Sequence, residues 1–298
     1  MEISQLKPRS AAMQLALERE AQKHLWRYRV GQALAYLIVA IACVAAIFPF
    51  LYIISLSFKQ STSLVTYPPQ WIPIPPYYGN YSLLLFDKPF LRWGLNTFIV
   101  AGSVTIIKLF FDSLAGYAFA KMEFPLKETL FILILATLMI PFAATLIPTF
   151  LIVRGLNLQN SYLGLIMPGL ANPIGIFMMR QFIESLPNDL ENAARLDGCS
   201  EFYIYWRIIL PLIRPALAVL GIFIFMTQWQ SFVWPLVITN TEDMRVLTVG
   251  LASLKGQWVT DWGLVAAGSV LIMLPITLVF IFFQRYFIAA SLAGALKE

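Results

Sequence analysis

The residues best suited to recognising another molecule lie in a polar insert, 184–215, between two strongly apolar segments. Asn188 and Glu191 have the N-cap and N3 spacing of a capping box, which predicts that a short helix begins there. Gly198 is expected to end this helix, because glycine takes the left-handed C-cap conformation without steric cost. Ser200 is expected to cap a second short helix. The insert therefore predicts helix, tight turn and helix, and the chemistry it offers is close contact with another protein.

Small residues and an Ile-x-Leu-Pro run follow a fixed spacing in this insert. The run NAARLDG followed by IILP resembles the cytoplasmic EAA loop of the membrane subunits of binding-protein-dependent ABC importers, whose pattern is E-A-A, three residues, G, nine residues, I-x-L-P. Asn192 departs from that pattern, since it stands where the family usually has glutamate, and Glu191 is one residue early. The resemblance implies that an ATPase docks here. The residues expected to couple to it are Glu191, Asn192, Ala193, Ala194, Asp197, Gly198, Ile208, Leu210 and Pro211.

The composition is that of an integral membrane protein. The chain is 59% hydrophobic and 12% charged, with a mean hydropathy of +0.74, so its apolar surface exceeds what one soluble core can bury. A helix needs about 20 apolar residues to cross a bilayer. Six runs are expected to do so: 34–57, 95–118, 130–153, 161–180, 213–237 and 263–284. The predicted fold class is an all-α membrane protein with six transmembrane helices.

The basic residues predict the orientation of these helices. With the N-terminus inside the cell, 14 Lys and Arg residues fall in cytoplasmic segments and 6 in outside segments. Both termini and the 184–215 insert are therefore expected in the cytoplasm. The net charge of +5 is explained by this anchoring, and no nucleic acid partner is expected.

No catalytic constellation is evident, so the chain is not expected to be an enzyme. The single histidine, His24, lies in the charged N-terminal segment, and there is no G-x-x-x-x-G-K-[ST] run to cradle a phosphate. No metal or cofactor is expected in this chain. Cys43 lies within a predicted span and Cys199 within the insert, so no disulfide is expected. The first 30 residues are too long and charged for a cleavable signal, and 13–26 is expected to be a helix along the membrane surface.

Three more stretches narrow the resemblance: AGYAFAKMEFP (115–125), LMIPFAATLIP (138–148) and the C-terminal QRYFIAASLAGALKE. They resemble the second membrane subunit of carbohydrate importers of the maltose type. This implies the ABC type I importer fold, with a permease domain over 31–290 between a cytoplasmic segment, 1–30, and a cytoplasmic tail, 291–298.

The same resemblance implies the partners of the chain. They are a homologous second permease subunit, two ATP-binding cassette subunits that hold ATP and Mg²⁺, a periplasmic or lipid-anchored solute-binding protein, and the lipids of a prokaryotic cell inner membrane. The tail is expected to reach the ATPase dimer through Gly294 and Lys297.

Polar groups at membrane depth are costly unless they are paired or face water, so each marks a candidate site. A cluster late in the fifth predicted span combines amides, which bond hydroxyls, with indoles, which pack on sugar rings. It comprises Gln228, Trp229, Gln230, Ser231 and Trp234. The cluster suits a carbohydrate pathway. The alternative is that these glutamines join transmembrane helices, and in the maltose system the sugar is held mainly by the other membrane subunit.

Other residues within the predicted spans have structural interpretations. Lys108 and Asp112 are spaced i, i+4 and are expected to form a neutralised pair, in preference to an ion relay. Prolines are expected to break the third and fourth spans, because they remove a helical hydrogen bond. They are Pro141, Pro148, Pro168 and Pro173.

Two outer loops, 60–93 and 238–262, are large enough to meet a partner. The second resembles the loop that projects into the open binding protein in maltose-type subunits, and the alternative is a solvated connector. The residues expected to contact the binding protein are Gly250, Leu251, Ala252, Leu254 and Gly256.

The residues and the resemblance together predict a permease subunit that forms half of the pathway for a sugar, either an oligosaccharide, a disaccharide or a related glycoside or polyol. Within the same class, the cargo could instead be a glycerol phosphoester or an osmolyte glycoside. An ion-driven secondary transporter would need an unpaired intramembrane carboxylate, and Asp112 is the only evident candidate. A membrane-embedded enzyme would need a nucleophile-base set or a metal cluster, which the sequence lacks.

Overall fold

The computed structural model describes residues 11–60, 70–255 and 260–295, and the regular structure within them is entirely helical. The chain divides into two units, Met1–Ser55 and Leu56–Glu298. The first unit contains all but the last two residues of α1 (Ala11–Ser57), whose Tyr28–Ser57 portion spans 30 residues at a mean hydropathy of 2.8. The helix expected along the membrane surface over 13–26 continues into this apolar portion without a break.

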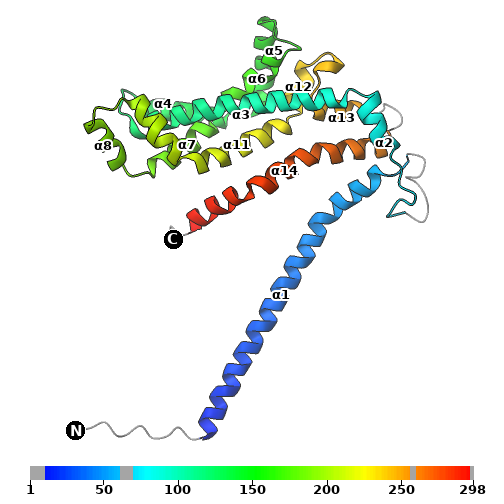
Figure 1. Ribbon diagram of the computed structural model, residues 1–298, viewed down its shortest axis with the longest axis vertical. Helices are drawn as coiled ribbons and strands as arrows, with labels where there is room; N and C mark the ends of the chain where they lie inside the picture. The colour runs from blue at the N-terminus through cyan, green and yellow to red at the C-terminus, as the bar shows by residue number, and fades with distance from the viewer. Residues whose placement is uncertain (1–10, 61–69, 256–259, 296–298) are drawn as a thin grey trace. The chain divides into compact units, whose positions relative to one another are not determined.

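The second unit is a bundle of helices of very different lengths (Figure 1). Its α-helices are α2 (Gly79–Ser82), α3 (Phe90–Lys121), α4 (Lys127–Ala136), α5 (Phe142–Gly155), α6 (Tyr162–Ile166), α7 (Ile174–Glu184), α8 (Asp189–Leu196), α9 (Glu201–Ile204), α10 (Leu210–Leu212), α11 (Arg214–Trp229), α12 (Val233–Ile238), α13 (Leu247–Ser253) and α14 (Trp262–Ala295). Short π-helical turns cover Leu83–Asp87 and Tyr205–Ile209, and 3₁₀ turns cover Thr137–Met139, Met167–Ala171 and Glu242–Met244.

Helix α3 forms the centre of this bundle, with α7 and α11 packed along it (Figure 1). Small residues permit the approach of α7. A Cβ on Gly116 would lie 2.5 Å from the Cβ of Met179, and a Cβ on Gly175 would lie 1.9 Å from Oδ2 of Asp112. Transmembrane helices use small residues in this way to bring their backbones together.

The predicted pair within α3 is confirmed. Nζ of Lys108 lies 3.0 Å from Oδ2 of Asp112, and both side chains are buried. Lys108 also donates a hydrogen bond to the carbonyl oxygen of Asn172, directly before α7. The two charges therefore neutralise each other inside the bundle and tie the middle of α3 to the start of α7.

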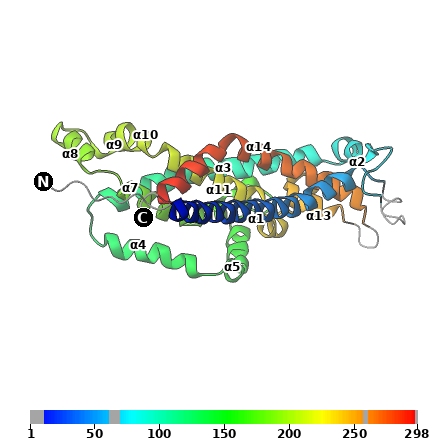
Figure 2. The ribbon, with the colours of Figure 1, turned by 90° about the horizontal axis from the view of Figure 1, so that it is seen from below.

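Within the described residues, three helices are long and apolar enough to cross a membrane, or up to six if each bent pair is one span. The predicted run 130–153 is divided by a bend of 100° between Met139 and Phe142, so that α5 stands across the direction of α4 (Figure 2). The run 161–180 is bent by 46° before Ile174. Pro141 and Pro173 lie at these two breaks, as expected from the loss of a backbone donor. Pro148 instead lies inside α5 and Pro168 in a 3₁₀ turn.

The fifth predicted run, 213–237, is also interrupted. Helix α11 ends at Trp229, and α12 begins at Val233. Two short helices, α8 and α9, lie at the end of the bundle where α3 finishes, while α2 and α13 lie at the opposite end (Figure 2). The bundle thus has two ends that are joined by α3.

Candidate functional site

The segment 188–211, here called the elbow, folds as helix, turn and helix. Gly198 ends the first helix with a φ of +79°, the conformation that favours glycine. Its amide donates to the carbonyl oxygen of Arg195 at 3.0 Å, and the Cys199 amide donates to that of Ala194 at 3.0 Å. These two bonds are the Schellman arrangement that satisfies the last carbonyls of a helix. The predicted end of the helix is confirmed.

The start of the elbow differs from the sequence prediction. Helix α8 begins directly after Asn188 as expected, but the Asn188 side chain makes no capping bond. Its Oδ1 accepts a hydrogen bond from Nζ of Lys121 at 2.5 Å instead. The capping box is therefore wrong in its mechanism, because a cation at the end of α3 supplies a stronger donor than the helix backbone does. Ser200 does cap the second helix, since its Oγ accepts from the Tyr203 amide at 3.3 Å.

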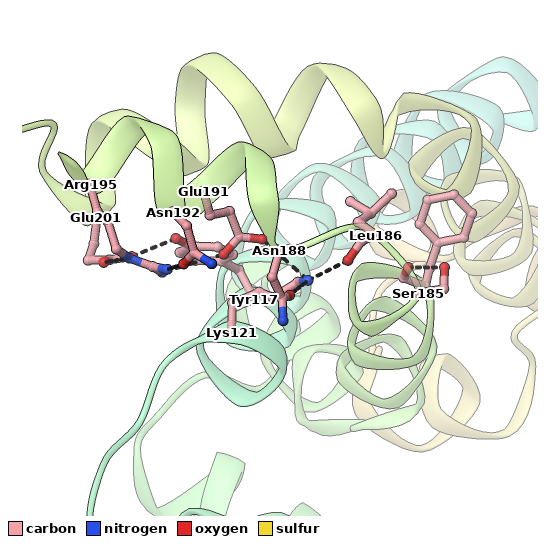
Figure 3. A network of polar contacts seen from close by, with 10 residues as sticks. Tyr117, Lys121, Ser185, Leu186, Asn188, Glu191, Asn192, Arg195 and Glu201 are labelled. Atoms are coloured by element: carbon pink, nitrogen blue, oxygen red, sulfur yellow. Dashed lines mark hydrogen bonds and ion pairs between the residues drawn. The ribbon is translucent and has the colours of Figure 1, made fainter. Parts of the chain in front are cut away.

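Glu191 joins the elbow to the bundle. Its side chain is buried and lies 3.4 Å from Nζ of Lys121 and 3.4 Å from a guanidinium nitrogen of Arg195. Lys121 also donates to the carbonyl oxygen of Leu186 at 2.7 Å. Figure 3 shows these groups converging between α3 and α8. We call Lys121 and Glu191 the clasp.

A second set of contacts fastens the far side of the turn. Arg195 donates to both carboxylate oxygens of Glu201, at 2.7 and 3.2 Å, and the Tyr117 hydroxyl donates to Glu201 at 2.6 Å (Figure 3). The hydrogen bonds from Arg195 lower the pKa of the Glu201 carboxyl, and the same contact raises the pKa of Arg195. Both groups therefore stay charged at neutral pH, and they hold α8 and α9 at a fixed angle.

The motif residues divide into an inward and an outward set. Glu191 and Ala194 are buried against the bundle, and Ile208 and Leu210 pack partly against the same core. The exposed residues are Asn192, Ala193, Leu196, Asp197, Gly198 and Pro211. Leu196 is 89% exposed, and the sequence analysis did not single it out. The outward set combines small groups at Ala193 and Gly198 with the exposed carboxylate of Asp197 and the apolar side chain of Leu196, and another protein can approach it closely at the small residues.

Asn192 lies on the outward side of α8. Its Oδ1 accepts a hydrogen bond from Arg195 at 3.3 Å. The glutamate one residue earlier, Glu191, faces the opposite way and is bound within the chain. The two adjacent positions therefore have different surroundings, and Glu191 does not occupy the outward position of Asn192.

The predicted pathway residues separate in the structure. Trp229 is buried in a cluster with α14, stacks on Phe225 at 5.5 Å and donates to the carbonyl oxygen of Ile272 at 3.2 Å. Trp234 belongs to the other core cluster and donates to the carbonyl oxygen of Gly164 at 3.0 Å. Gln230 is exposed. The two indoles therefore do not share one surface.

The other two polar residues of the predicted pathway, Gln228 and Ser231, lie near interruptions between helices. Gln228 lies against Gly169, where an added Cβ would meet its amide group at 3.3 Å. The carbonyl oxygen of Ser231 accepts a hydrogen bond from Thr248 at 2.5 Å, which joins the end of α11 to α13.

The segment after α12 is held by α3. Asn96 donates to the carbonyl oxygens of Asp243 and Arg245, and the Trp93 indole donates to that of Glu242 at 2.9 Å. Helix α13 then packs on the bundle, and a Cβ on Gly250 would lie 2.2 Å from the Trp93 ring.

The predicted binding-protein contacts therefore differ in accessibility. Gly250 is buried, while Leu251, Ala252 and Leu254 are partly buried. Gly256 lies outside the described residues, as does Lys297 in the tail, whereas Gly294 falls within α14.

Sequence comparison places these features in a known family. A family model described as "Binding-protein-dependent transport system inner membrane component" matches residues 113–290. The arabinooligosaccharides transport system permease protein AraQ of Halalkalibacterium halodurans is 36% identical over 260 residues, covering 85% of this chain and 91% of the relative. The sulfoquinovosyl glycerol transport system permease protein SmoH of Agrobacterium fabrum is 32% identical over 269 residues, covering 90% and 94%.

A solved structure agrees with these relatives. A chain of a bacterial ABC transporter involved in the import of the acidic polysaccharide alginate superposes with a TM-score of 0.79 at 25% identity, covering 87% of this chain and 97% of that one. The residues matched by the family model, 113–290, include the elbow. The chain therefore belongs to the family of binding-protein-dependent transport system inner membrane components.

Proposed function

We propose that this chain forms half of the translocation pathway of an ATP-driven sugar importer in the inner membrane of a prokaryote. Its partners in this proposal are a homologous permease subunit, two ATPase subunits and a solute-binding protein. The elbow carries the proposal. Its outward face offers small groups at Ala193 and Gly198 beside the carboxylate of Asp197, while its inward face is locked to α3 by the clasp. A coupling element needs a surface that another protein can approach closely, and it needs a rigid link to the bundle.

The proposed cycle follows from that arrangement. ATP closes the ATPase dimer, the dimer moves the elbow, and the elbow moves α3 because Lys121 and Glu191 join them. The bundle then opens outward to receive sugar from the docked binding protein. ATP and Mg²⁺ belong to the ATPase subunits in this scheme, and the orientation is the one in which the elbow and both termini face the cytoplasm.

The cargo class is drawn from the relatives. Two are named for arabinooligosaccharides and for sulfoquinovosyl glycerol, and the structural neighbour for alginate. All three cargoes are polyhydroxylated, which supports a sugar or glycoside. They differ in charge, since sulfoquinovosyl glycerol and alginate are anionic.

Reconstitution tests this function. The chain, its homologous permease, the two ATPase subunits and the binding protein are purified together and placed in proteoliposomes with internal ATP. We expect ATP-dependent uptake of an arabinooligosaccharide, a sulfoquinovosyl glycerol or an alginate oligosaccharide. Uptake driven by a proton or sodium gradient in liposomes that contain this chain without ATPase subunits would refute the proposal.

A further inference from the structure

A hollow of about 460 Å³ lies where the broken helices of the second unit meet. Its lining includes Thr137 from the turn after α4, Thr145 and Thr149 from α5, Asn172 from the break before α7, and Trp234 from α12. The volume lies within the range of small-molecule sites, roughly 300–1,000 Å³. Both helix breaks that the bends of 100° and 46° create contribute to this one hollow.

The hollow lies near the middle of the membrane-spanning bundle. Helix α3 has 32 residues, a length of roughly 48 Å, and Lys108 lies roughly 27 Å from its start at 1.5 Å per residue. Lys108 donates to the carbonyl oxygen of Asn172, so the lining of the hollow is at mid-span depth. Irregular backbone at that depth is tolerated where it is buried or faces a water-filled cavity, and discontinuous helices form the solute sites of many transporters.

The polar groups of the lining suit hydroxylated solutes. The hydroxyls of Thr137 and Thr145 donate to carbonyl oxygens of their own helical turns, at 2.7 and 3.0 Å, which leaves oxygen lone pairs to accept from a ligand. Oδ1 of Asn172 accepts from the Ile174 amide at 3.0 Å, and its NH₂ group is a donor. The Trp234 ring is fixed by its bond to Gly164. Acceptors, a donor and an aromatic ring together match a sugar.

The charge of the lining distinguishes among sugars. None of the described residues that line the hollow carries a charge. The cation at this depth, Lys108, is already neutralised by Asp112 at 3.0 Å and is 3% exposed. An anionic group such as a sulfonate, carboxylate or phosphate would lose its hydration here without gaining a partner from this chain.

We propose that this hollow is the site at which this subunit contacts an uncharged sugar in transit. The inference rests on the proposed function and narrows it, because it assigns residues outside the Gln228–Ser231 cluster to the pathway and disfavours acidic glycosides and glycerol phosphoesters as cargo. The alternative occupant is the second permease subunit, whose side chains could fill the hollow in the complex.

The test uses the complete complex in proteoliposomes, with arabinotriose, an alginate trisaccharide and glycerol 3-phosphate as probes. Thr145→Val and Thr149→Val are combined, which removes two hydroxyls at nearly constant volume. Thr277→Val is the matched control, because the Thr277 hydroxyl also donates within its own helix, to Met273 at 2.9 Å, and is not part of the lining. Separately, Thr149→Cys in a Cys43→Ser/Cys199→Ser background is treated with a charged, water-soluble thiol reagent.

We expect arabinotriose to be the preferred probe. The double variant should reduce its uptake roughly three- to tenfold, the effect of one or two lost hydrogen bonds, while Thr277→Val leaves it unchanged. The Thr149→Cys thiol should react from water, and arabinotriose during turnover should slow that reaction.

Three results would overturn the inference. An unreactive Thr149→Cys thiol would mean that the second permease or lipid fills the hollow. Equal uptake by the double variant and by Thr277→Val would show that Thr145 and Thr149 do not contact the sugar. Preference for either anionic probe would refute the assignment to uncharged cargo. Failure of the unchanged complex to transport any probe would count against the proposed function itself, whereas a loss confined to the double variant would not.

Discussion

At the scale of single residues, breaking the buried clasp is expected to have a large energetic effect. Lys121 and Glu191 have side chains that are 4% and 2% exposed, so removing one partner leaves the other charge buried. Such a loss costs about 3–5 kcal/mol. Exposed ion pairs contribute roughly 0–1 kcal/mol to stability. Breaking the clasp is therefore expected to cost more than breaking an exposed pair, because the clasp is buried.

Glu191→Gln should therefore loosen the elbow and reduce uptake by more than it reduces ATP hydrolysis. The matched control is Glu123→Gln, which breaks the pair with Lys127 at a carboxylate that is 93% exposed. The ratio of sugar transported to ATP hydrolysed, with the melting temperature of the purified complex, gives the measurement. An unchanged ratio in Glu191→Gln would show that the elbow moves α3 by another route.

At the scale of elements, the turn of the elbow depends on one backbone conformation. A Cβ on Gly198 would meet no heavy atom within 4 Å in this chain, so the constraint comes from its φ of +79° and not from crowding. A β-branched residue is strongly disfavoured there, while asparagine is tolerated.

Gly198→Val is expected to abolish most uptake while the bundle still inserts, and Gly198→Asn is expected to keep a substantial part of it. Uptake and copurification of the ATPase subunits measure the outcome. If both variants lose the ATPases equally, a side chain of any conformation blocks the docking surface. Normal uptake by Gly198→Val would mean that the elbow does not couple.

Helix α13 and the segment that follows it should respond differently to substitution. Gly250 touches the Trp93 ring, and overpacking such a site costs roughly 1–3 kcal/mol, so Gly250→Val should lower the melting temperature of the complex.

Lys255 is exposed on the segment that follows α13. Lys255→Glu should leave stability and basal ATP hydrolysis unchanged and weaken stimulation by the binding protein. Full stimulation in Lys255→Glu would leave this segment as a connector.

At the scale of the whole molecule, the sequence predicted what local rules determine. The end of α8 at Gly198, the cap at Ser200 and the Lys108–Asp112 pair each depend on residues within five positions of one another, and all three are present. The clasp joins residues 70 positions apart, 121 and 191, and no periodicity or motif relates them. The hydrogen bond between Lys121 and Asn188 likewise depends on tertiary packing.

The bend angles and the hollow also could not be predicted from residues that are close together in the sequence. A proline predicts a break in a helix but not its angle, which is 100° in one broken run and 46° in the other. Trp229 and Trp234 are five residues apart but lie in different core clusters, and Trp234 also lines the hollow, because α11 and α12 are separate helices. The signal that could have identified the hollow is the presence of Thr145, Thr149 and Asn172 beside prolines in otherwise apolar runs.

Orientation is the remaining property of the whole molecule, and the distribution of basic residues along the chain predicts it. The basic residues, 14 against 6, favour the elbow end in the cytoplasm, since Lys and Arg concentrate on that side. Glu123, directly after the end of α3, and Asn240, directly after α12, are both exposed and lie toward opposite ends of α3. In a Cys43→Ser/Cys199→Ser background, Glu123→Cys should react with an impermeant thiol reagent in inside-out vesicles, and Asn240→Cys in right-side-out vesicles. The reverse pattern would place the elbow outside the cell, away from any ATPase, and labelling of both from one side would contradict an arrangement in which α3 crosses the membrane.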